Sequence, residues 1–273
     1  MTIWQALFLG VVQGLTEFLP VSSSAHLILV PKLLGWADQG LSFDVAAHLG
    51  TFLAVLIYFR RDLTDLVAGF WRALRGSPEP GDRRAWKLGW MLVWGTAPIA
   101  IVGLLAKDWA ETQARNAPLI AATSIVFGLL LIAADRWAAK RRGLAEITWP
   151  DAVSVGCAQA LAVVPGVSRS GVTMTTALAR GLDREAAARF SFLLFVPASC
   201  LVAAKHALDL AGGKIPSAEL VPMGVGFLAA LVSGYLVIGW LLSWIRLRSL
   251  APFGWYRVIL GLSLLVLWAR GWF

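Results

Sequence analysis

The chain has 273 residues, of which 58% are hydrophobic and 15% are charged, and its formal net charge is +8. Soluble domains are about 45–50% apolar and about 25% charged, so this composition argues against disorder, a disulfide scaffold and an ordinary soluble enzyme. It predicts an all-α, polytopic membrane protein, because a membrane-spanning helix needs about 20 apolar residues.

Residues 1–34 are apolar but are interrupted by a polar stretch that contains a proline: Gln13-Gly-Leu-Thr-Glu17-Phe-Leu-Pro20-Val-Ser22-Ser23-Ser24-Ala-His26. Gln13 and Glu17 lie four residues apart and therefore face one side of a helix. Pro20 ends that helix, and the serines after it are good N-caps for a second one. A carboxylate inside a membrane costs about 2.5–3.5 kcal/mol unless it is paired or hydrated, so Glu17 indicates either a functional site or a structural ion pair.

The hydroxyl and imidazole side chains of this break each allow two interpretations. The serines, Ser22–Ser24, fit a role as helix caps at least as well as a role as substrate ligands. His26 is either a buried hydrogen-bonding side chain or, beside Glu17 and the serines, an acid, base or nucleophile. His48, which lies early in the next apolar segment, Val45–Phe59, is interpreted as mostly structural.

Six further segments are apolar enough to be plain spans, and they carry no interior charge except Arg257, about one turn inside the last. Phe190–Ala204 is shorter than the others, but its flanking Arg189 and Lys205 can snorkel toward the membrane surface. The other five segments are Val45–Phe59, Leu88–Ala106, Ala117–Ala134, Leu220–Ile245 and Pro252–Ala269.

A second broken region covers residues 151–180, and its centre reads Val164-Pro-Gly-Val-Ser168-Arg169-Ser170-Gly-Val-Thr173. Pro-Gly turns the chain and the Ser/Thr run opens a helix, with Ser168 and Ser170 again either caps or ligands. Both broken regions are predicted to be re-entrant hairpins, which must be buried in protein or line a cavity. Two helix N-termini and Arg169 suit a phosphate or pyrophosphate; an ion pair between Arg169 and Glu17 is the compatible alternative.

Lysine and arginine residues divide unequally between the two ends of this arrangement. With two re-entrant hairpins and six spans, 17 of the 24 basic residues, Arg257 among them, fall on one side, 6 on the other and Arg169 inside the second break. The positive-inside rule then places the crowded side in the cytoplasm and both termini outside. The count does not distinguish a re-entrant hairpin from a traversing pair of helices. The net charge of +8 thus reflects topology and argues against nucleic acid as a partner.

An internal repeat relates the two broken regions. A shift of 146 residues aligns eight identical pairs within thirty positions, including Gln13 with Gln159 and Ser22 with Ser168. Each repeat, approximately 1–146 and 147–273 of one membrane domain 1–273, contains a broken hairpin and three spans. The odd number of spans inverts the second copy, and such repeats place a polar site near the midplane where the breaks meet.

The two breaks resemble the two motifs of the undecaprenyl-pyrophosphate phosphatase family of the bacitracin-resistance type. The first motif begins at Gln13 and Glu17 and ends at His26, and the second covers Pro165–Thr173. Length, segment count and spacing fit across essentially the whole chain. Gln13 stands where many members have Glu, and Ser24-Ala stands where Thr-Gly is common.

The resemblance implies removal of the terminal phosphate from a C55 polyprenyl pyrophosphate in the bacterial inner membrane, at its outward, periplasmic face. The product is the monophosphate carrier lipid of peptidoglycan synthesis, and a divalent cation, magnesium or calcium, is required. The expected catalytic residues are Glu17, which also binds the metal, Ser23, His26 and Arg169. The expected substrate-binding residues are Gln13, Ser22, Ser24, Ser168, Ser170 and Thr173.

The attacking group is left open by this reasoning. Ser23 activated by His26 or Glu17 is favoured, and His26 itself or a metal-bound water also fits the spacing. The prenyl tail is expected in a lateral opening between spans, and a homodimer is one option for the assembly. The functional alternative is a secondary transporter or lipid flippase, because inverted repeats with broken helices are typical of transporters.

Overall fold

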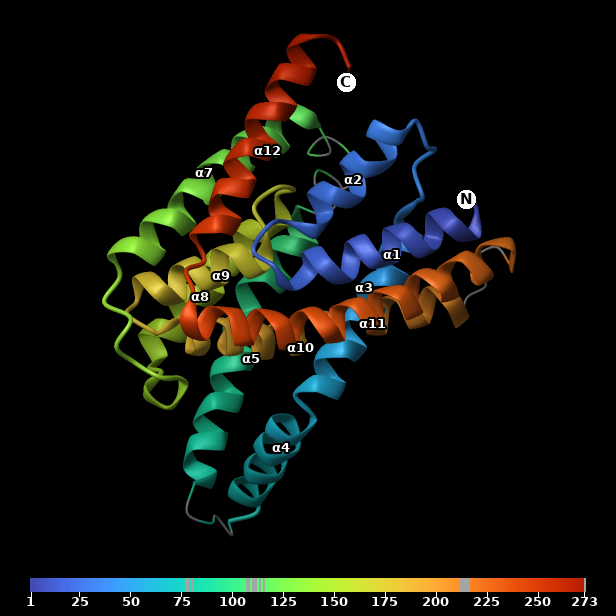
Figure 1. The fold of residues 1–273 in the computed structure, drawn as a ribbon. Helices are drawn as coiled ribbons and strands as arrows, with labels where there is room; N and C mark the ends of the chain where they lie inside the picture. Colours follow the sequence, from blue (N-terminus) through green and yellow to red (C-terminus); the bar gives the residue numbers. More distant parts are fainter. Residues whose placement is uncertain are drawn as a thin grey trace.

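A computed structural model describes residues 1–76, 79, 81–106, 109, 112, 114, 116–211 and 217–272. Within these residues the chain is helical and contains no β-strand, so the predicted all-α class is confirmed (Figure 1). The elements are α1 (Ile3–Phe18), α2 (Ser23–Leu34), α3 (Leu41–Tyr58), α4 (Arg60–Leu74), α5 (Asp82–Leu105), α7 (Ala117–Trp137), η1 (Leu144–Glu146), α8 (Trp149–Ala160), η2 (Leu161–Val163), α9 (Arg169–Ala179), α10 (Arg184–Ala211), α11 (Ser217–Leu247) and α12 (Ala251–Ala269).

Six of the described helices, α3, α5, α7, α10, α11 and α12, are long and apolar enough to cross a membrane, as predicted. They extend beyond the predicted segments because helical backbone continues into the charged ends; α5, for example, begins at Asp82 rather than Leu88. The helix α4 lies where only a basic loop was expected. Because α4 contains several charged residues, its sequence does not form an apolar segment, although the side chains of Trp71 and Leu74 are exposed.

Both broken regions are helical hairpins, and their breaks have the same local cause. Leu19 and Val164 each precede a proline and are extended, which ends the helical hydrogen bonding there. After the break, Ser22 (φ 75°) and Ser168 (φ 68°) adopt the left-handed region, which non-glycine residues seldom occupy. The Ser22 hydroxyl accepts from the amide of Ala25, and the Ser168 hydroxyl accepts from the amide of Gly171. Equivalent serines of the two repeats therefore start α2 and α9 in the same way.

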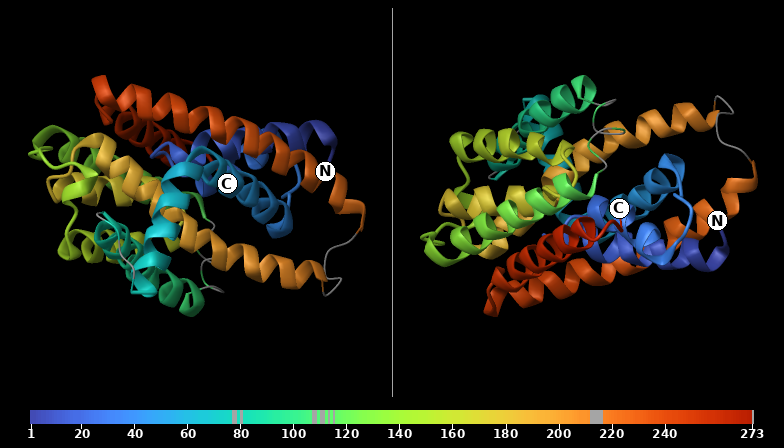
Figure 2. Two further views of the ribbon diagram at one scale, coloured as in Figure 1. Left: turned by 90° about the horizontal axis from the view of Figure 1, so that it is seen from below. Right: turned by 90° about the horizontal axis from the view of Figure 1, so that it is seen from above.

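The two hairpins open toward opposite ends of the molecule. At one end, Asp151 at the start of α8 is fully buried and bonds to Arg142 and to Arg180, just after α9. Burial alone raises the pKa of the Asp151 carboxyl, but bonds from Arg142, Thr148 and Arg180 outweigh it and hold the pKa well below its usual range. At the other end, Met1, Gln5 and residues 37–39 share a cavity with Glu219 and Met223 at the start of α11. The views in Figure 2 agree with this inverted arrangement.

The end that carries Asp151 holds most of the basic residues, and ion pairs there join segments that are distant in sequence. Arg189 donates to Asp62, and Arg246 makes two hydrogen bonds to Glu185. Of the six basic residues predicted at the opposite end, Lys107, Arg115 and Lys214 lie outside the described residues. The division into repeats at residue 146 stays a prediction.

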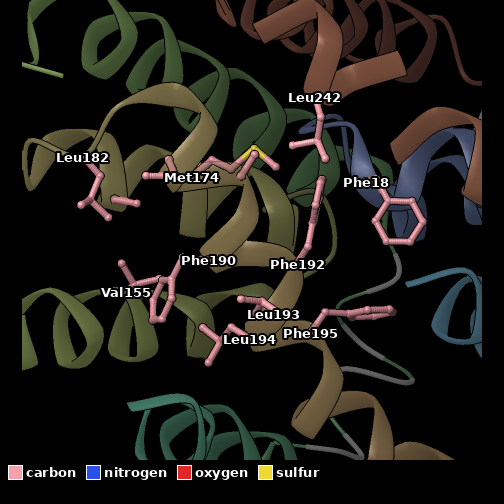
Figure 3. Close-up of a cluster of buried hydrophobic side chains, with 14 of the residues drawn as sticks. Phe18, Val155, Met174, Leu182, Phe190, Phe192, Leu193, Leu194, Phe195 and Leu242 are labelled. Carbon is pink, nitrogen blue, oxygen red and sulfur yellow. The ribbon is translucent and has the colours of Figure 1, made fainter. Parts of the chain in front are cut away.

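The centre of the molecule is built on α10, whose aromatic side chains pack against the end of α1 (Figure 3). The Phe18 ring contacts Phe192 and Phe195 edge to face, at centroid distances of 5.4 and 5.9 Å. Because Phe18 is the residue after Glu17, this packing fixes the end of α1 in the core. A Cβ at Gly10 or Gly156, an aligned pair, would lie 2.5 Å from the backbone oxygen of Gly226 or Gly95, so each hairpin crosses a long helix closely.

Candidate active site

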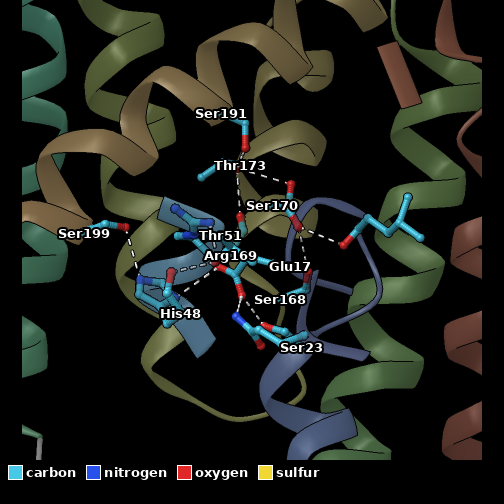
Figure 4. A network of polar contacts seen from close by, with 12 residues as sticks. Glu17, Ser23, His48, Thr51, Ser168, Arg169, Ser170, Thr173, Ser191 and Ser199 are labelled. Atoms are coloured by element: carbon cyan, nitrogen blue, oxygen red, sulfur yellow. Dashed lines mark hydrogen bonds and ion pairs between the residues drawn. The ribbon is translucent and has the colours of Figure 1, made fainter. Parts of the chain in front are cut away.

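Glu17 is the centre of a polar network that joins the two breaks (Figure 4). Its carboxylate is 7% exposed and accepts at Oε1 from Nη2 of Arg169, at 2.8 Å. The other oxygen, Oε2, accepts from the hydroxyl of Ser23 at 2.5 Å and from the amide of Gln13 at 2.9 Å. The ion pair between Glu17 and Arg169, which the sequence analysis gave as the alternative compatible with phosphate binding, is therefore present across 152 positions, and Ser23 lies beside it.

The guanidinium of Arg169 is only partly satisfied by the protein. Its side chain is 14% exposed, its Cζ lies 3.6 Å from the centroid of the Phe195 ring, and Nη2 is bonded to Glu17. Its Nη1 is buried and has no hydrogen-bond partner among the described residues. Because buried polar atoms are normally paired, this nitrogen is a free donor for an anionic ligand.

The remaining serines and Thr173 lie around this centre. Ser22 and Ser168 are buried caps, and their hydroxyls lie 3.2 and 3.3 Å from those of Ser24 and Ser170. Ser170 also donates to the carbonyl of Leu19, across to the first break. The Thr173 hydroxyl lies 2.7 Å from that of Ser191. These hydroxyls mainly fix the backbone of the breaks, and Ser24 alone of this group is exposed.

His26 is not brought to Glu17 or Ser23. Its Nδ1 lies 2.7 Å from the carbonyl of Ser22, so Nδ1 carries the hydrogen, and Nε2 accepts from the hydroxyl of Tyr256 at 2.6 Å. In this geometry the carboxylate of Glu17, rather than His26, is the base in contact with Ser23.

His48, interpreted as mostly structural from the sequence, lies at the centre of the site. Its Nδ1 is 3.7 Å from Oε1 of Glu17, and its Nε2 lies 3.1 Å from the hydroxyl of Ser199. Its ring also contacts the edge of Phe195. The available signal was the position of a polar residue inside an apolar span, which usually marks a functional site.

Arg257 lies in the core and not at the cytoplasmic end predicted for it. It was counted with the cytoplasmic basic residues, but its side chain is fully buried and donates to the carbonyls of Pro20, Gly166 and Val167 in the two breaks. Subtracting Arg257 from the 17 leaves 16 basic residues on the crowded side. Glu17 and Arg169 are therefore not the only charged groups at the broken centre.

A divalent cation could be bound at this site by Glu17 only if the substrate supplied further ligands. No group of three or more His, Cys, Asp or Glu side chains in the described part of the chain is arranged to hold a metal ion. Glu17 supplies one carboxylate, and Mg²⁺ is commonly bound by one or two carboxylates together with water and substrate phosphates. The residues present therefore fit an ion that is bound jointly by Glu17 and a phosphate-bearing substrate.

The fold and the site define a class: a polytopic helical membrane protein in which two oppositely oriented hairpins form a buried, anion-compatible junction. The family model described as bacitracin resistance protein BacA matches residues 6–263, which include both breaks. The chain belongs to this family.

Curated relatives align over nearly the whole chain. A protein of Magnetococcus marinus named undecaprenyl-diphosphatase is 46% identical over 268 residues, which cover 96% of this chain and 97% of that protein. Undecaprenyl-diphosphatase 2 of Stutzerimonas stutzeri is 46% identical, with coverage of 98% and 99%. An undecaprenyl-diphosphatase of Gemmatimonas aurantiaca is 48% identical, with coverage of 96% of both chains.

Proposed function

We propose that the protein hydrolyses undecaprenyl pyrophosphate to undecaprenyl phosphate and inorganic phosphate. This reaction recycles the lipid carrier of peptidoglycan synthesis and confers bacitracin resistance. The family and the names of the relatives support this function. The structural observation that carries it is the contact of Glu17 with Ser23 and Arg169, beside the unpartnered Nη1 of Arg169.

Binding of the pyrophosphate is assigned to Arg169 and the start of α9. A guanidinium presents donors in a fixed fork that matches phosphate oxygens, and the N-terminus of a helix adds partial positive charge. The unpartnered Nη1 is the guanidinium nitrogen assigned to the terminal phosphate. Full bidentate binding then draws Nη2 away from Glu17 and frees its Oε1, while Oε2 keeps its hydrogen bond to the Ser23 hydroxyl.

Ser23 is the proposed nucleophile and Glu17 its base. The hydroxyl proton passes to Oε2, to which it is already hydrogen-bonded, and Oγ attacks the terminal phosphorus. The bond from that phosphorus to the bridging oxygen breaks, and undecaprenyl phosphate leaves with the bridging oxygen. Water then hydrolyses the phosphoserine to inorganic phosphate. A water activated directly by Glu17 is the alternative nucleophile, because the site is partly open at Ser23.

The cofactor and the placement in the cell are part of the proposal. Magnesium or calcium, bound by Glu17 together with the substrate, would offset the negative charge of the pyrophosphate. The positive-inside rule supports a cytoplasmic location for the end with 16 basic residues and an outward-opening site in the inner membrane. The polyprenyl tail would lie between spans among membrane lipids, and a homodimer stays a prediction.

Phosphate release from C55 pyrophosphate by purified protein in detergent tests this function. We expect turnover that EDTA abolishes and that added Mg²⁺ or Ca²⁺ restores. Arg169→Ala should lower the rate at least about a hundredfold, because electrostatic stabilisation of a transferring phosphoryl group is usually a large contribution. Arg246→Ala, which removes an exposed arginine at the basic end, is the matched control and should retain activity. Wild-type activity in Arg169→Ala would contradict the mechanism.

The inverted repeat keeps a transporter or lipid flippase as the second candidate. Turnover in detergent micelles distinguishes the two, because an enzyme needs no second compartment and a transporter performs no chemistry there. A wild-type protein that binds the lipid pyrophosphate but releases no phosphate with Mg²⁺ or Ca²⁺ would favour transport.

A further inference from the structure

We propose that Arg257 is a positioning residue for the phosphatase reaction: from α12 its guanidinium links the backbones of the two breaks and supplies the positive charge that favours pyrophosphate binding. This inference rests on the proposed function. It starts from a group that the sequence analysis placed about one turn inside the last span and counted with the cytoplasmic basic residues, and that the structure buries completely.

The hydrogen bonds of Arg257 reach both repeats at aligned positions. Nη2 donates to the carbonyls of Gly166 and Val167, each at 2.8 Å, and Nη1 donates to the carbonyl of Pro20 at 3.4 Å. Pro20 and Gly166 are aligned by the 146-residue shift of the repeat. One side chain therefore holds equivalent carbonyls of the two breaks at a fixed separation.

A hydrogen bond to a break does not by itself require a charged residue. From α7, which packs along α12 (Figure 1), the hydroxyl of Thr123 lies 2.8 Å from the carbonyl oxygen of Pro165 and shares its one hydrogen between that carbonyl and those of Leu119 and Ile120. A neutral side chain thus contributes a comparable bond to the second break. The positive charge of Arg257 needs a separate explanation, because burying a cation is expensive.

Neighbouring groups leave this charge uncompensated. None of the ion pairs between described residues involves Arg257, and its buried Nε has no hydrogen-bond partner there. A Cβ added to Gly171 would lie 2.5 Å from Nη1 of Arg257, so the guanidinium lies against the first turn of α9. That turn is itself electropositive. Two positive groups in contact are stabilised by an anion, and the carboxylate of Glu17 is already paired with Arg169.

The formal charges of the junction follow from these contacts. Glu17 and Arg169 cancel, and Arg257 leaves an excess of one positive charge for the pyrophosphate to neutralise. Because Arg257 is fully buried, it acts through the backbone rather than by touching the phosphate. The carbonyls it holds belong to Gly166 and Val167, directly before Ser168 and Arg169, so it fixes where the phosphate-binding arginine begins.

Charge and geometry are separated by two substitutions, with Thr123→Val as the neutral control. Arg257→Met removes the positive charge and both donor nitrogens, Nη1 and Nη2. Arg257→Lys keeps the charge but has a single ammonium group, which cannot donate to both breaks at once. The measurements are kcat, KM, the inhibition constant of inorganic pyrophosphate, and the rise in Tm that pyrophosphate produces. The kinetic measurements are made below the Tm of the weakest variant.

In Arg257→Met we expect the pyrophosphate inhibition constant to rise at least about tenfold, because the attraction of one buried positive charge near the anion is lost, and the Tm rise to disappear. Arg257→Lys should keep an inhibition constant near that of the wild type but lose about tenfold or more in kcat. Thr123→Val should lower Tm without changing the inhibition constant.

Three results would overturn the proposal. These are an Arg257→Met variant with wild-type kcat and inhibition constant, equal losses of pyrophosphate affinity in the Lys and Met variants, and an equal loss in Thr123→Val. Failure of the proposed function is distinguishable. If the wild type releases no phosphate from the lipid, the Tm rise with pyrophosphate still tests whether the charge of Arg257 governs anion binding.

Discussion

Removing the charge of Glu17 should destabilise the protein as well as inactivate it. Glu17→Gln keeps the volume of the side chain but leaves Arg169 as an uncompensated cation that is largely buried, against Phe195. Breaking one partner of a buried ion pair costs about 3–5 kcal/mol. For proteins of about 150–250 residues, a loss of 1 kcal/mol lowers Tm by about 2–4 °C. We therefore expect the Tm of Glu17→Gln to decrease by on the order of 10 °C.

The double substitution gives the stronger test. Arg169→Met alone strands the carboxylate and should cost a similar amount, whereas Glu17→Gln with Arg169→Met removes both charges. Replacing a buried pair by uncharged groups is often nearly neutral, so the double variant should recover much of the lost Tm while remaining inactive. Arg246→Met with Glu185→Gln, an exposed pair, should show coupling below about 1 kcal/mol.

Thermal unfolding in detergent, followed at one scan rate by the fluorescence of the 14 tryptophans, provides the stability readout, and phosphate release provides the activity. If the decrease in Tm of the double variant equals the sum of the two single decreases, the two side chains are not energetically coupled and the ion pair is not the organising contact of the site.

Further substitutions test the packing of the hairpins and the role of His26. Gly156→Ala places a Cβ 2.5 Å from a backbone oxygen of α5 and should cost about 3 kcal/mol by overpacking, measured as Tm; Gly103→Ala, whose Cβ meets nothing, should not decrease Tm. Tyr256→Phe removes the hydroxyl that donates to Nε2 of His26 and should destabilise the protein by about 1 kcal/mol, measured as Tm, with kcat near that of the wild type because Glu17 is the proposed base; Tyr235→Phe should change neither. A loss of kcat of about tenfold in Tyr256→Phe would instead give His26 a role in catalysis.

The parts of the structure that follow from local chemistry could be predicted from the sequence. Proline after an extended residue ends a helix, and a serine before a helix caps it, so both breaks were located to within a few residues. The ion pair between Glu17 and Arg169 was one of two compatible interpretations of these residues, because charged side chains buried in a membrane usually pair with one another. The repeat supplied the expectation that the two breaks meet.

The partners added by other helices could not be predicted in the same way. The position of Arg257 near the end of a span is equally compatible with snorkelling to the surface, and only the packing of α12 beside α7 directs it inward. His48 reaches Glu17 because α3 passes the end of α1, and Tyr256 reaches His26 across 230 positions. These contacts depend on tertiary packing that a single sequence does not encode locally.

The repeat also explains why the chemistry of the site is unequal in its two halves. The 146-residue shift aligns Ser23 with Arg169, and both are the first helical residue after their break. From these equivalent positions they donate to the two oxygens of one carboxylate. Serine at both positions would leave the buried Glu17 without Arg169 as its counterion, and arginine at both would remove the Ser23 hydroxyl, which is the proposed nucleophile. A symmetric backbone therefore performs an asymmetric reaction because the repeats differ at this position and at Glu17, whose counterpart is Val163.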